Sequence, residues 1–172
     1  MNQLSQISNK IVDLKDALKQ RENWKSMQES VVFTNGCFDI LHVGHVTYLA
    51  RAKDLGNHLI VAINTDNSVK RLGKGDERPI NPQEARALTL AALSSVDLVV
   101  FFDDDTPLTV IESLNPDVLV KGSDYNPDEI DPTSKQYIVG SSYIKQQGGQ
   151  VAVISLVEGY STSAIAAKLK SK

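Results

Sequence analysis

The sequence has one cysteine in 172 residues, and a lone cysteine cannot form an intramolecular disulfide. It also has no apolar run close to the roughly 20 residues that a membrane-spanning helix needs. Its N-terminus lacks the basic, apolar and small-residue segments of a signal peptide. These absences predict a cytoplasmic protein with no membrane partner. We interpret Cys37 as a small packing residue, because the sequence identifies no base that would activate its thiol.

An excess of basic residues is absent as well. The chain carries 18 lysines and arginines against 21 aspartates and glutamates, a formal net charge of −3. Nucleic-acid-binding surfaces usually contain a basic patch or stripe, so nucleic acid is not an expected partner. A small anionic ligand would have to be held by a few well-placed cations. The length fits one domain with a proper core.

Five short apolar runs alternate with helical patterns along the chain. The runs that predict strands are residues 31–33, 59–63, 98–102, 117–122 and 151–154. This alternation predicts an α/β fold, a Rossmann-like doubly wound parallel five-stranded sheet with helices on both faces. Ligands of such sheets bind at the carboxyl ends of the strands. No G-x-G-x-x-G motif follows the first strand, which argues against a dinucleotide-dependent dehydrogenase.

An amphipathic helix is predicted before the first strand. Apolar residues recur every three or four positions between Gln3 and Gln20, namely Leu4, Ile7, Ile11, Leu14 and Leu18. This stripe fits packing on its own domain and a dimer contact equally well. Residues 21–30 are predicted to be a polar connector in which Trp24 pins the helix to the body. We therefore divide the chain into residues 1–30, the helix and connector, and residues 31–172, the main domain.

The most informative stretch follows the first predicted strand. Turn residues at 34–36 end that strand, and the chain then re-enters as a helix. His42 and His45 lie three residues apart at the helix start, so they share one face. Gly44 between them has no side chain, which lets a bulky anion approach a helix end that favours phosphate. The coincidence of these features predicts a phosphate site with two imidazoles rather than an ordinary polar helix start.

Further polar residues follow the predicted strands. Asp66 follows the second strand, and the pattern leaves open whether it binds a ribose or caps the next turn. The basic, glycine-containing loop 69–79 suggests a flap over phosphates, although it does not have Walker A spacing. Pro82 is predicted at the first position of the next helix. We interpret the acidic run 103–105 through the dipole of a following helix capped by Thr106, and not as a metal site.

Two later stretches complete the predicted edge of the sheet. Lys121 closes a buried strand, where a lysine has little structural reason to be. The hydroxyls of Ser161, Thr162 and Ser163 stand at a predicted helix start. Such hydroxyls can cap a helix or donate to a phosphate, and three together favour the phosphate.

The segment Thr34-Asn-Gly-Cys-Phe-Asp-Ile-Leu-His-Val-Gly-His45 resembles the signature of the cytidylyltransferase-like nucleotidyltransferases, which share a His-x-Gly-His motif. Within that family it is most similar to the adenylyltransferases that act on D-glycero-β-D-manno-heptose 1-phosphate and make ADP-heptose. The resemblance runs from about Val31 to the C-terminus. It implies ATP and a sugar 1-phosphate as substrates, Mg²⁺ with the nucleoside triphosphate, and a homodimer or higher homo-oligomer.

The resemblance also implies roles for individual residues. His42, His45 and Lys70 are the implied catalytic residues, with His45 at the α-phosphate, His42 at the triphosphate, and Lys70 together with Ser161 at the β- and γ-phosphates. The implied nucleotide-binding residues are Thr34, Asn35, Gly36, Phe38, Gly44, Asp66, Arg78, Arg86, Ser161, Thr162 and Ser163. The implied sugar-phosphate-binding residues are Asp39, Lys121 and Asp124. No metal-ligating side chain is predicted. Arg86 is expected to brace the nucleotide loop, with an exposed helix salt bridge as the alternative.

The sequence departs from the family pattern in two places. Residues 131–138 read as an insertion after the presumed sugar site, which bears on the identity of the acceptor. The segment Glu158-Gly159-Tyr160 stands near the position where some cytidylyltransferases have an arginine, so the basic flap would neutralise the leaving pyrophosphate. No single side chain identifies adenine. A cytidylyltransferase for glycerol 3-phosphate and a non-catalytic nucleotide-binding subunit therefore stay open as alternatives.

Overall fold

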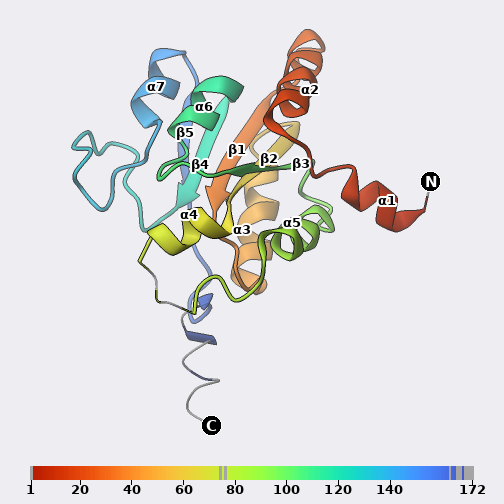
Figure 1. Cartoon of the computed structure of the whole chain (residues 1–172). Helices are drawn as coiled ribbons and strands as arrows, with labels where there is room; N and C mark the ends of the chain where they lie inside the picture. Colours follow the sequence, from red (N-terminus) through yellow and green to blue (C-terminus); the bar gives the residue numbers. More distant parts are fainter. Residues whose placement is uncertain (1, 74, 76, 163, 166–167, 169–172) are drawn as a thin grey trace.

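A parallel five-stranded sheet forms the centre of the protein (Figure 1). The computed structural model describes residues 2–73, 75, 77–162, 164–165 and 168. The strands are β1 (Val31–Gly36), β2 (His58–Asn64), β3 (Leu98–Phe102), β4 (Val118–Gly122) and β5 (Gln150–Ile154). Their spatial order is β3-β2-β1-β4-β5, and every neighbouring pair is parallel. The order reverses between β1 and β4, so the crevice expected in such sheets lies at the carboxyl ends of these two strands.

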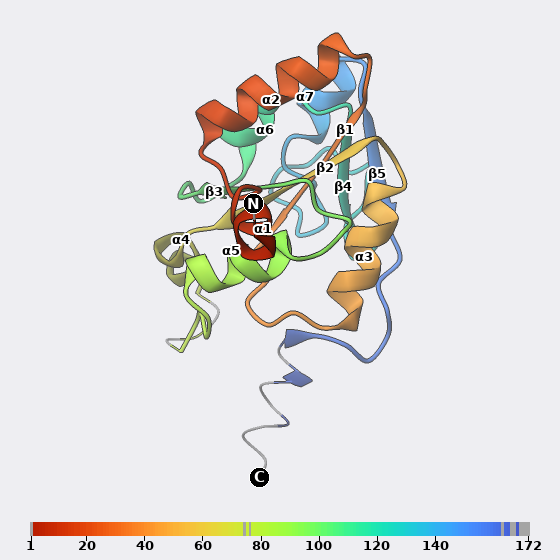
Figure 2. The same ribbon diagram turned by 90° about the vertical axis from the view of Figure 1, so that its right-hand side faces the viewer.

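Helices cover both faces of the sheet (Figure 2), which confirms the doubly wound fold. One face packs against α1 (Gln3–Ser8), α3 (Val43–Lys53) and α5 (Gln83–Ala91). The other face packs against α2 (Leu14–Ser26), α6 (Leu108–Leu114) and α7 (Ser141–Gln146). The short helix α4 (Asp66–Arg71) follows β2. Alternate strand residues supply the two cores, because successive side chains in a strand point to opposite faces. In the described part of the chain no helix is both long and apolar enough to cross a membrane.

The predicted single helix from Gln3 to Gln20 is wrong, because the chain is helical only in two separate pieces. Between α1 and α2 the backbone runs alongside β3. The N–H of Val12 donates to the carbonyl of Val99 over 3.0 Å, and the N–H of Val99 donates to the carbonyl of Lys10 over 2.8 Å. Asp13 then starts α2, because its carboxylate accepts the N–H of Asp16 over 2.8 Å.

The apolar stripe that predicted one helix is divided between the two faces of the sheet. Ile7 and Ile11 pack against the core on the α3 side. Leu14 and Leu18 pack against the core on the α2 side. The three- and four-residue spacing is real, but the chain passes around the β3 edge in the middle of it. Periodicity alone does not reveal such a crossing.

The predicted connector at residues 21–30 is largely the second half of α2, so this part of the prediction is also wrong. The anchoring role predicted for Trp24 is confirmed, since its buried indole stacks on the His58 ring with centroids 4.0 Å apart. Arg21 is buried too and donates to the carbonyl of Asn115 over 3.0 Å. Residues 14–26 are therefore part of the core rather than a tether.

Two predicted helix starts are shifted. Pro82 is the N-cap residue of α5 and not its first helical residue. Thr106 does not cap α6, which begins at Leu108 without a side-chain cap. The acidic run before it is held instead by Arg71, whose Nε donates to Asp105 over 2.7 Å. Arg71 of α4 thus pairs with the carboxylates of Asp103 and Asp105.

A buried pair of hydroxyls anchors α3 to the sheet. The hydroxyls of Thr34 and Tyr48 lie 2.7 Å apart, and each lies 3.1 Å from the carbonyl oxygen of Val120. Thr34 is completely buried in β1, and burial raises the pKa of Tyr48. The contact therefore joins β1, β4 and the second turn of α3 through one carbonyl. It sets the height at which the start of α3 stands above the sheet.

We expect Tyr48→Phe to lower the free energy of unfolding by about 1–3 kcal/mol, because it leaves buried polar groups with fewer partners. Urea unfolding followed by circular dichroism measures this change. Tyr143→Phe is the matched control, since its hydroxyl bonds the carbonyl of Glu112 at an exposed position over 3.2 Å. Equal losses in the two variants would show that the hydroxyl pair does not anchor α3.

Candidate active site

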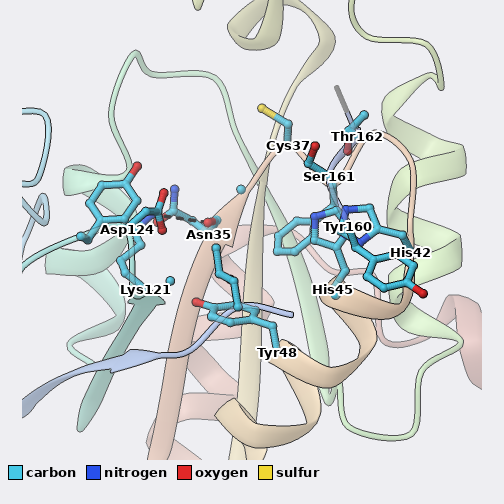
Figure 3. Close-up of a pocket in the computed structure, with 16 residues that line it drawn as sticks. Asn35, Cys37, His42, His45, Tyr48, Lys121, Asp124, Tyr160, Ser161 and Thr162 are labelled. Atoms are coloured by element: carbon cyan, nitrogen blue, oxygen red, sulfur yellow. Dashed lines mark hydrogen bonds between the residues drawn. The ribbon is translucent and has the colours of Figure 1, made fainter. Parts of the chain in front are cut away.

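A cavity of about 300 Å³ opens at the carboxyl ends of β1 and β4, beside the start of α3 (Figure 3). Its walls come from five separate parts of the chain. The lining residues are Asn35, Gly36, Cys37, Phe38, His42, Gly44, His45, Tyr48, Lys121, Gly122, Asp124, Tyr125, Leu156, Tyr160, Ser161 and Thr162. The cavity thus occupies the position where the strand order reverses, as the fold predicts.

The two histidines of the motif form one side of this cavity. His42 is the N-cap residue of α3 and His45 lies in its first turn. Their rings stack with centroids 3.9 Å apart and planes 20° apart. The N-terminus of this 11-residue helix adds a partial positive charge and free N–H groups at the same place. Both imidazoles therefore stand where an anion would be held.

Gly44 lines the cavity and also leaves room for two neighbouring side chains. A Cβ atom at Gly44 would lie 2.9 Å from Nδ1 of His42 and 3.5 Å from Cβ of Tyr160. The missing side chain thus makes room for the His42 ring and for the tyrosine beyond it. The absence of a side chain at Gly44 therefore lets the His42 imidazole lie over the start of α3.

Burial keeps both imidazoles neutral at pH 7. Desolvation lowers the pKa of His42, and desolvation together with the charge of His42 lowers the pKa of His45 to about 4. A contact with the backbone of Ile40 opposes the second shift. Each neutral ring carries one N–H donor and one acceptor nitrogen. The pair can therefore donate hydrogen bonds to phosphate oxygens without first gaining a proton.

Several buried polar atoms around the cavity have no hydrogen-bond partner in the described part of the chain. Five such side-chain atoms occur there, and three of them belong to cavity residues: Oδ1 of Asn35, Nδ1 of His42 and Nδ1 of His45. Buried polar groups are normally paired, and exceptions concentrate where a ligand or water completes the bonding. This concentration marks the cavity as a binding site.

The loop between β1 and α3 shapes the cavity floor through Phe38. Phe38 has φ of 48°, in the left-handed region that side chains rarely adopt. Its buried ring meets the His45 ring edge-on with centroids 5.1 Å apart. A Cβ at Gly36 would lie 3.0 Å from this ring, so the glycine gives the ring its space. Strain of this kind is often kept at functional sites.

The wall opposite the histidines comes from the end of β4. Lys121 donates to the carbonyl of Asn35 over 3.4 Å, and its Nζ lies 5.4 Å from the centre of the Tyr125 ring. Asp124 lines the cavity on the same side (Figure 3). The structure thus places Lys121 and Asp124 across the cavity from His42 and His45.

The predicted C-terminal hydroxyls reach the cavity from a distant part of the sequence. Ser161 and Thr162 line it next to the histidines, and the Tyr160 ring lies 6.5 Å from that of His42. Oγ of Ser161 accepts the N–H of Ala164 over 3.1 Å, which is a capping bond. The hydroxyl proton of Ser161 is still available to a ligand. Ser163 lies outside the described residues.

Arg86 braces the loops around the site and does not line the cavity. Its guanidinium is 1% exposed and donates to the carbonyls of Cys37 (2.7 Å) and Asn64 (2.9 Å) and to Asp66 (2.7 Å). Nε donates to the carbonyl of Asn81 over 3.1 Å. The alternative of an exposed salt bridge is therefore wrong. Direct nucleotide contact by Asp66 is also not supported, since its carboxylate holds Arg86.

Asp39, predicted to bind the sugar phosphate, lines an adjoining cavity and is bonded by groups of the chain itself. Its buried carboxylate accepts bonds from Arg78 (2.6 Å), from the N–H of Ile80 (2.8 Å) and from the N–H of Asn81 (2.9 Å). Burial opposes ionisation, but the two N–H groups and the guanidinium hold the pKa of Asp39 below its usual range. The role of Asp39 is to tie the basic loop to the motif loop.

Arg78 is brought to the site by this pairing. Together with Asp39, His45 and Thr162 it lines an adjoining cavity of about 450 Å³. This second cavity meets the first one at His45 and Thr162. Arg78 is thus the basic residue of loop 69–79 that lines this cavity.

The structure does not bring two other predicted residues to these cavities. Lys70 is exposed in the last turn of α4 and lines none of the cavities at this edge. Thr34 is buried against Tyr48 and Val120, so it positions α3 instead of touching a nucleotide. In both cases the direction of the side chain determines whether the residue reaches a cavity. The spacing of residues in the motif does not reveal that direction.

Six cavity residues were not predicted as site residues from the sequence: Cys37, Tyr48, Gly122, Tyr125, Leu156 and Tyr160. Tyr48 follows His45 by three residues and so shares its helix face, which was a usable signal. Tyr125 directly follows Asp124, which was assigned from the sequence to the sugar-phosphate site. Leu156 lies in a segment after β5 that has no periodic pattern, and nothing in the sequence distinguishes it.

Comparisons with known proteins agree with this geometry. Residues 33–168 match the family model described as cytidylyltransferase-like. The chain is 48% identical over 165 residues to the bifunctional protein HldE of Magnetococcus marinus, covering 96% of this chain and 32% of that protein. It is 48% identical over 167 residues to the bifunctional protein HldE of Helicobacter pylori, covering 97% and 32%. The chain thus spans about a third of the length of these curated relatives.

Solved structures show the same fold. The lipopolysaccharide core biosynthesis protein from Thermoplasma volcanium is similar with a TM-score of 0.57 and 27% identity, covering 77% of this chain and 99% of that one. The pantoate-beta-alanine ligase from Francisella tularensis has a TM-score of 0.58 at 15% identity, covering 93% and 76%. The second likeness concerns the fold alone. With a family model matching most of its length and relatives at 48% identity, the chain belongs to the cytidylyltransferase-like family of nucleotidyltransferases.

Proposed function

We propose that the chain transfers AMP from ATP to D-glycero-β-D-manno-heptose 1-phosphate, giving ADP-heptose and pyrophosphate. The observation that carries this proposal is the cavity at the start of α3. There two neutral imidazoles and a helix N-terminus face Lys121 across the carboxyl edge of the sheet. The relatives named HldE and the T. volcanium protein of lipopolysaccharide core biosynthesis support the choice of acceptor.

The reaction needs alignment and charge stabilisation more than an activated group on the protein. An oxygen of the sugar phosphate forms a bond to the α-phosphorus, the bond from that phosphorus to the bridging oxygen breaks, and pyrophosphate leaves. The acceptor is already an anion at neutral pH, so no protein nucleophile is required. The site has to hold two anions in line and to stabilise charge on the α-phosphate oxygens in the transition state.

The cavity residues divide this work between them. His45, the more buried imidazole, donates to the α-phosphate oxygens, and His42 at the rim donates to the triphosphate. The hydroxyls of Ser161 and Thr162 and the guanidinium of Arg78 take the β- and γ-phosphates in the adjoining cavity. Because burial keeps the rings neutral, the free enzyme avoids repulsion between two adjacent cations.

We propose that Mg²⁺ arrives with the triphosphate. Among the described residues, no group of three or more His, Cys, Asp or Glu side chains could hold a metal ion. This fits an ion that is bound largely by substrate phosphates and water, as Mg²⁺ commonly is. When bound, Mg²⁺ neutralises phosphate charge and helps to orient the leaving pyrophosphate.

Pyrophosphate release tests the proposed function directly. The purified chain is assayed with ATP or CTP, each combined with heptose 1-phosphate or glycerol 3-phosphate, in the presence of Mg²⁺. We expect rapid release only with ATP and heptose 1-phosphate. Release with CTP and glycerol 3-phosphate would favour the cytidylyltransferase alternative. No release with any pair would favour a non-catalytic nucleotide-binding subunit.

His45→Ala should lower kcat by roughly 100- to 1,000-fold, the usual effect of removing one donor to a transition-state oxyanion. The KM for ATP should change much less, because the donor acts mainly in the transition state. Steady-state kinetics measure both quantities. His58→Ala is the control, because His58 is the first residue of β2 and so lies at the end of the sheet away from the cavity. Equal losses in kcat and ATP affinity, or no loss in either, would contradict the assignment of His45.

The lowered pKa of His45 also predicts a pH dependence of stability. Its pKa is about 4 in the folded chain, against 6.5 for an ordinary histidine. Between these values the unfolded chain binds a proton that the folded chain does not. The free energy of unfolding therefore falls as the pH falls from 6.5 to about 4, and this contribution is constant below that.

Urea unfolding at a series of pH values measures this effect. We expect the wild type to lose stability more steeply than His45→Gln between pH 6.5 and 4. Parallel losses would mean that the His45 ring is hydrated in the folded protein. That result would be inconsistent with the buried imidazole pair.

A further inference from the structure

A third cavity, of about 400 Å³, adjoins the first one on the side away from the histidines. The two cavities share one wall, formed by Asn35, Gly36, Cys37, Lys121 and Tyr125. Of these two cavities, only the first is lined by the histidines. A group at the shared wall can therefore face a nucleotide on one side while the rest of its molecule lies on the other. The volume falls within the range of about 300–1,000 Å³ that small-molecule sites occupy.

The far wall of this third cavity includes the segment that reads as an insertion in the sequence. Lys135, Tyr137 and Val139 line it, together with Asp105 and Thr106 from the loop between β3 and α6. Lys135 and Tyr137 belong to the longer segment 126–140, which contains residues 131–138 and forms the long loop that projects beside β4 in Figure 1. The cavity is thus lined by groups that bond hydroxyls, namely an ammonium, a phenol, a carboxylate and an alcohol.

Segment 126–140 is held in place by its own contacts. The N–H of Asn126 donates to the carbonyl of Gln136 over 2.9 Å, which closes the loop. Ile138 is completely buried in the core on the α6 side, and Lys145 of α7 donates to the carbonyl of Pro127 over 2.6 Å. The residues beside Ile138 are therefore carried into the cavity wall by a packed anchor.

The charges of the cavity suit an anionic ligand with hydroxyl groups. Lys121 stands at the shared wall and Lys135 at the far wall. Asp105 is paired with Arg71 over 2.7 Å, so its negative charge is already balanced. Lys135 forms no ion pair with any described residue. Its ammonium is available for a substrate.

We propose that the acceptor sugar lies in this third cavity, with its phosphate at the shared wall near Lys121 and its hydroxyls against Lys135 and Tyr137. Segment 126–140 then determines acceptor specificity. This inference rests on the proposed function, because it names where the acceptor of that reaction is held. A hydroxylated sugar phosphate is favoured over a short alcohol phosphate, which would leave the far wall without a partner.

Lys135→Met tests the proposal, with Lys25→Met as the matched control, since Lys25 is an exposed lysine in the last turn of α2. Lys135 is exposed as well, so its replacement should not unfold the chain, and circular dichroism checks this. We expect Lys135→Met to raise the KM for heptose 1-phosphate about tenfold or more and the KM for ATP less than twofold. Tyr137→Phe should raise the KM for heptose 1-phosphate by a smaller factor.

Inorganic phosphate serves as a competitor that occupies the shared wall without a sugar. Its inhibition constant against heptose 1-phosphate should be the same in the wild type and in Lys135→Met. An equal weakening of phosphate and of heptose 1-phosphate would overturn the assignment, because Lys135 would then hold the phosphate. An unchanged KM in Lys135→Met, with an active wild type, would overturn this inference alone. A wild type inactive with heptose 1-phosphate would overturn the proposed function and this inference together.

Discussion

The buried guanidinium of Arg86 is the interaction on which the carboxyl edge of the sheet depends. It binds the carbonyls of the motif loop, of the end of β2 and of the turn before α5, and it pairs with Asp66. Burying a charge is costly unless hydrogen bonds satisfy it. Here every nitrogen of the guanidinium has an acceptor, so the loop after β1 and both ends of the segment between β2 and α5 are locked to one rigid, planar group.

The active cavity follows from that lock and from the order of the strands. Neighbouring crossovers leave β1 in opposite directions, so a gap opens between the ends of β1 and β4. The start of α3 enters this gap at a height set by the Thr34–Tyr48 contact. The imidazoles are thereby desolvated and neutral, and they meet a wall of β4 residues. The position of α3 thus determines both the shape of the cavity and the neutral state of its two imidazoles.

Much of the fold and the centre of the site could be predicted from local patterns. Buried strands and amphipathic helices have different periods, and the motif from Thr34 to His45 has its own spacing, so neither depends on distant contacts. The prediction of a single N-terminal helix was wrong, because Ile11 and Leu14 pack on different faces of the sheet although their spacing is helical. Asp39 and Arg78 were each predicted as site residues from the sequence, but only the tertiary structure shows that they form an ion pair.

The sequence by itself determined the layered α/β architecture, the family, and the place of the two histidines at a helix start, because these depend on residues close together in the chain. The tertiary structure alone decided which polar groups reach the ligand cavities and which serve as braces. Thr34, Asp39, Asp66 and Arg86 hold the loops and α3 in place, while Tyr160 lines the cavity at the start of α3. Lys135, Tyr137 and Val139 line the cavity beside it. The reason is physical: a side chain's direction and partners depend on residues far away in sequence, which local periodicity does not record.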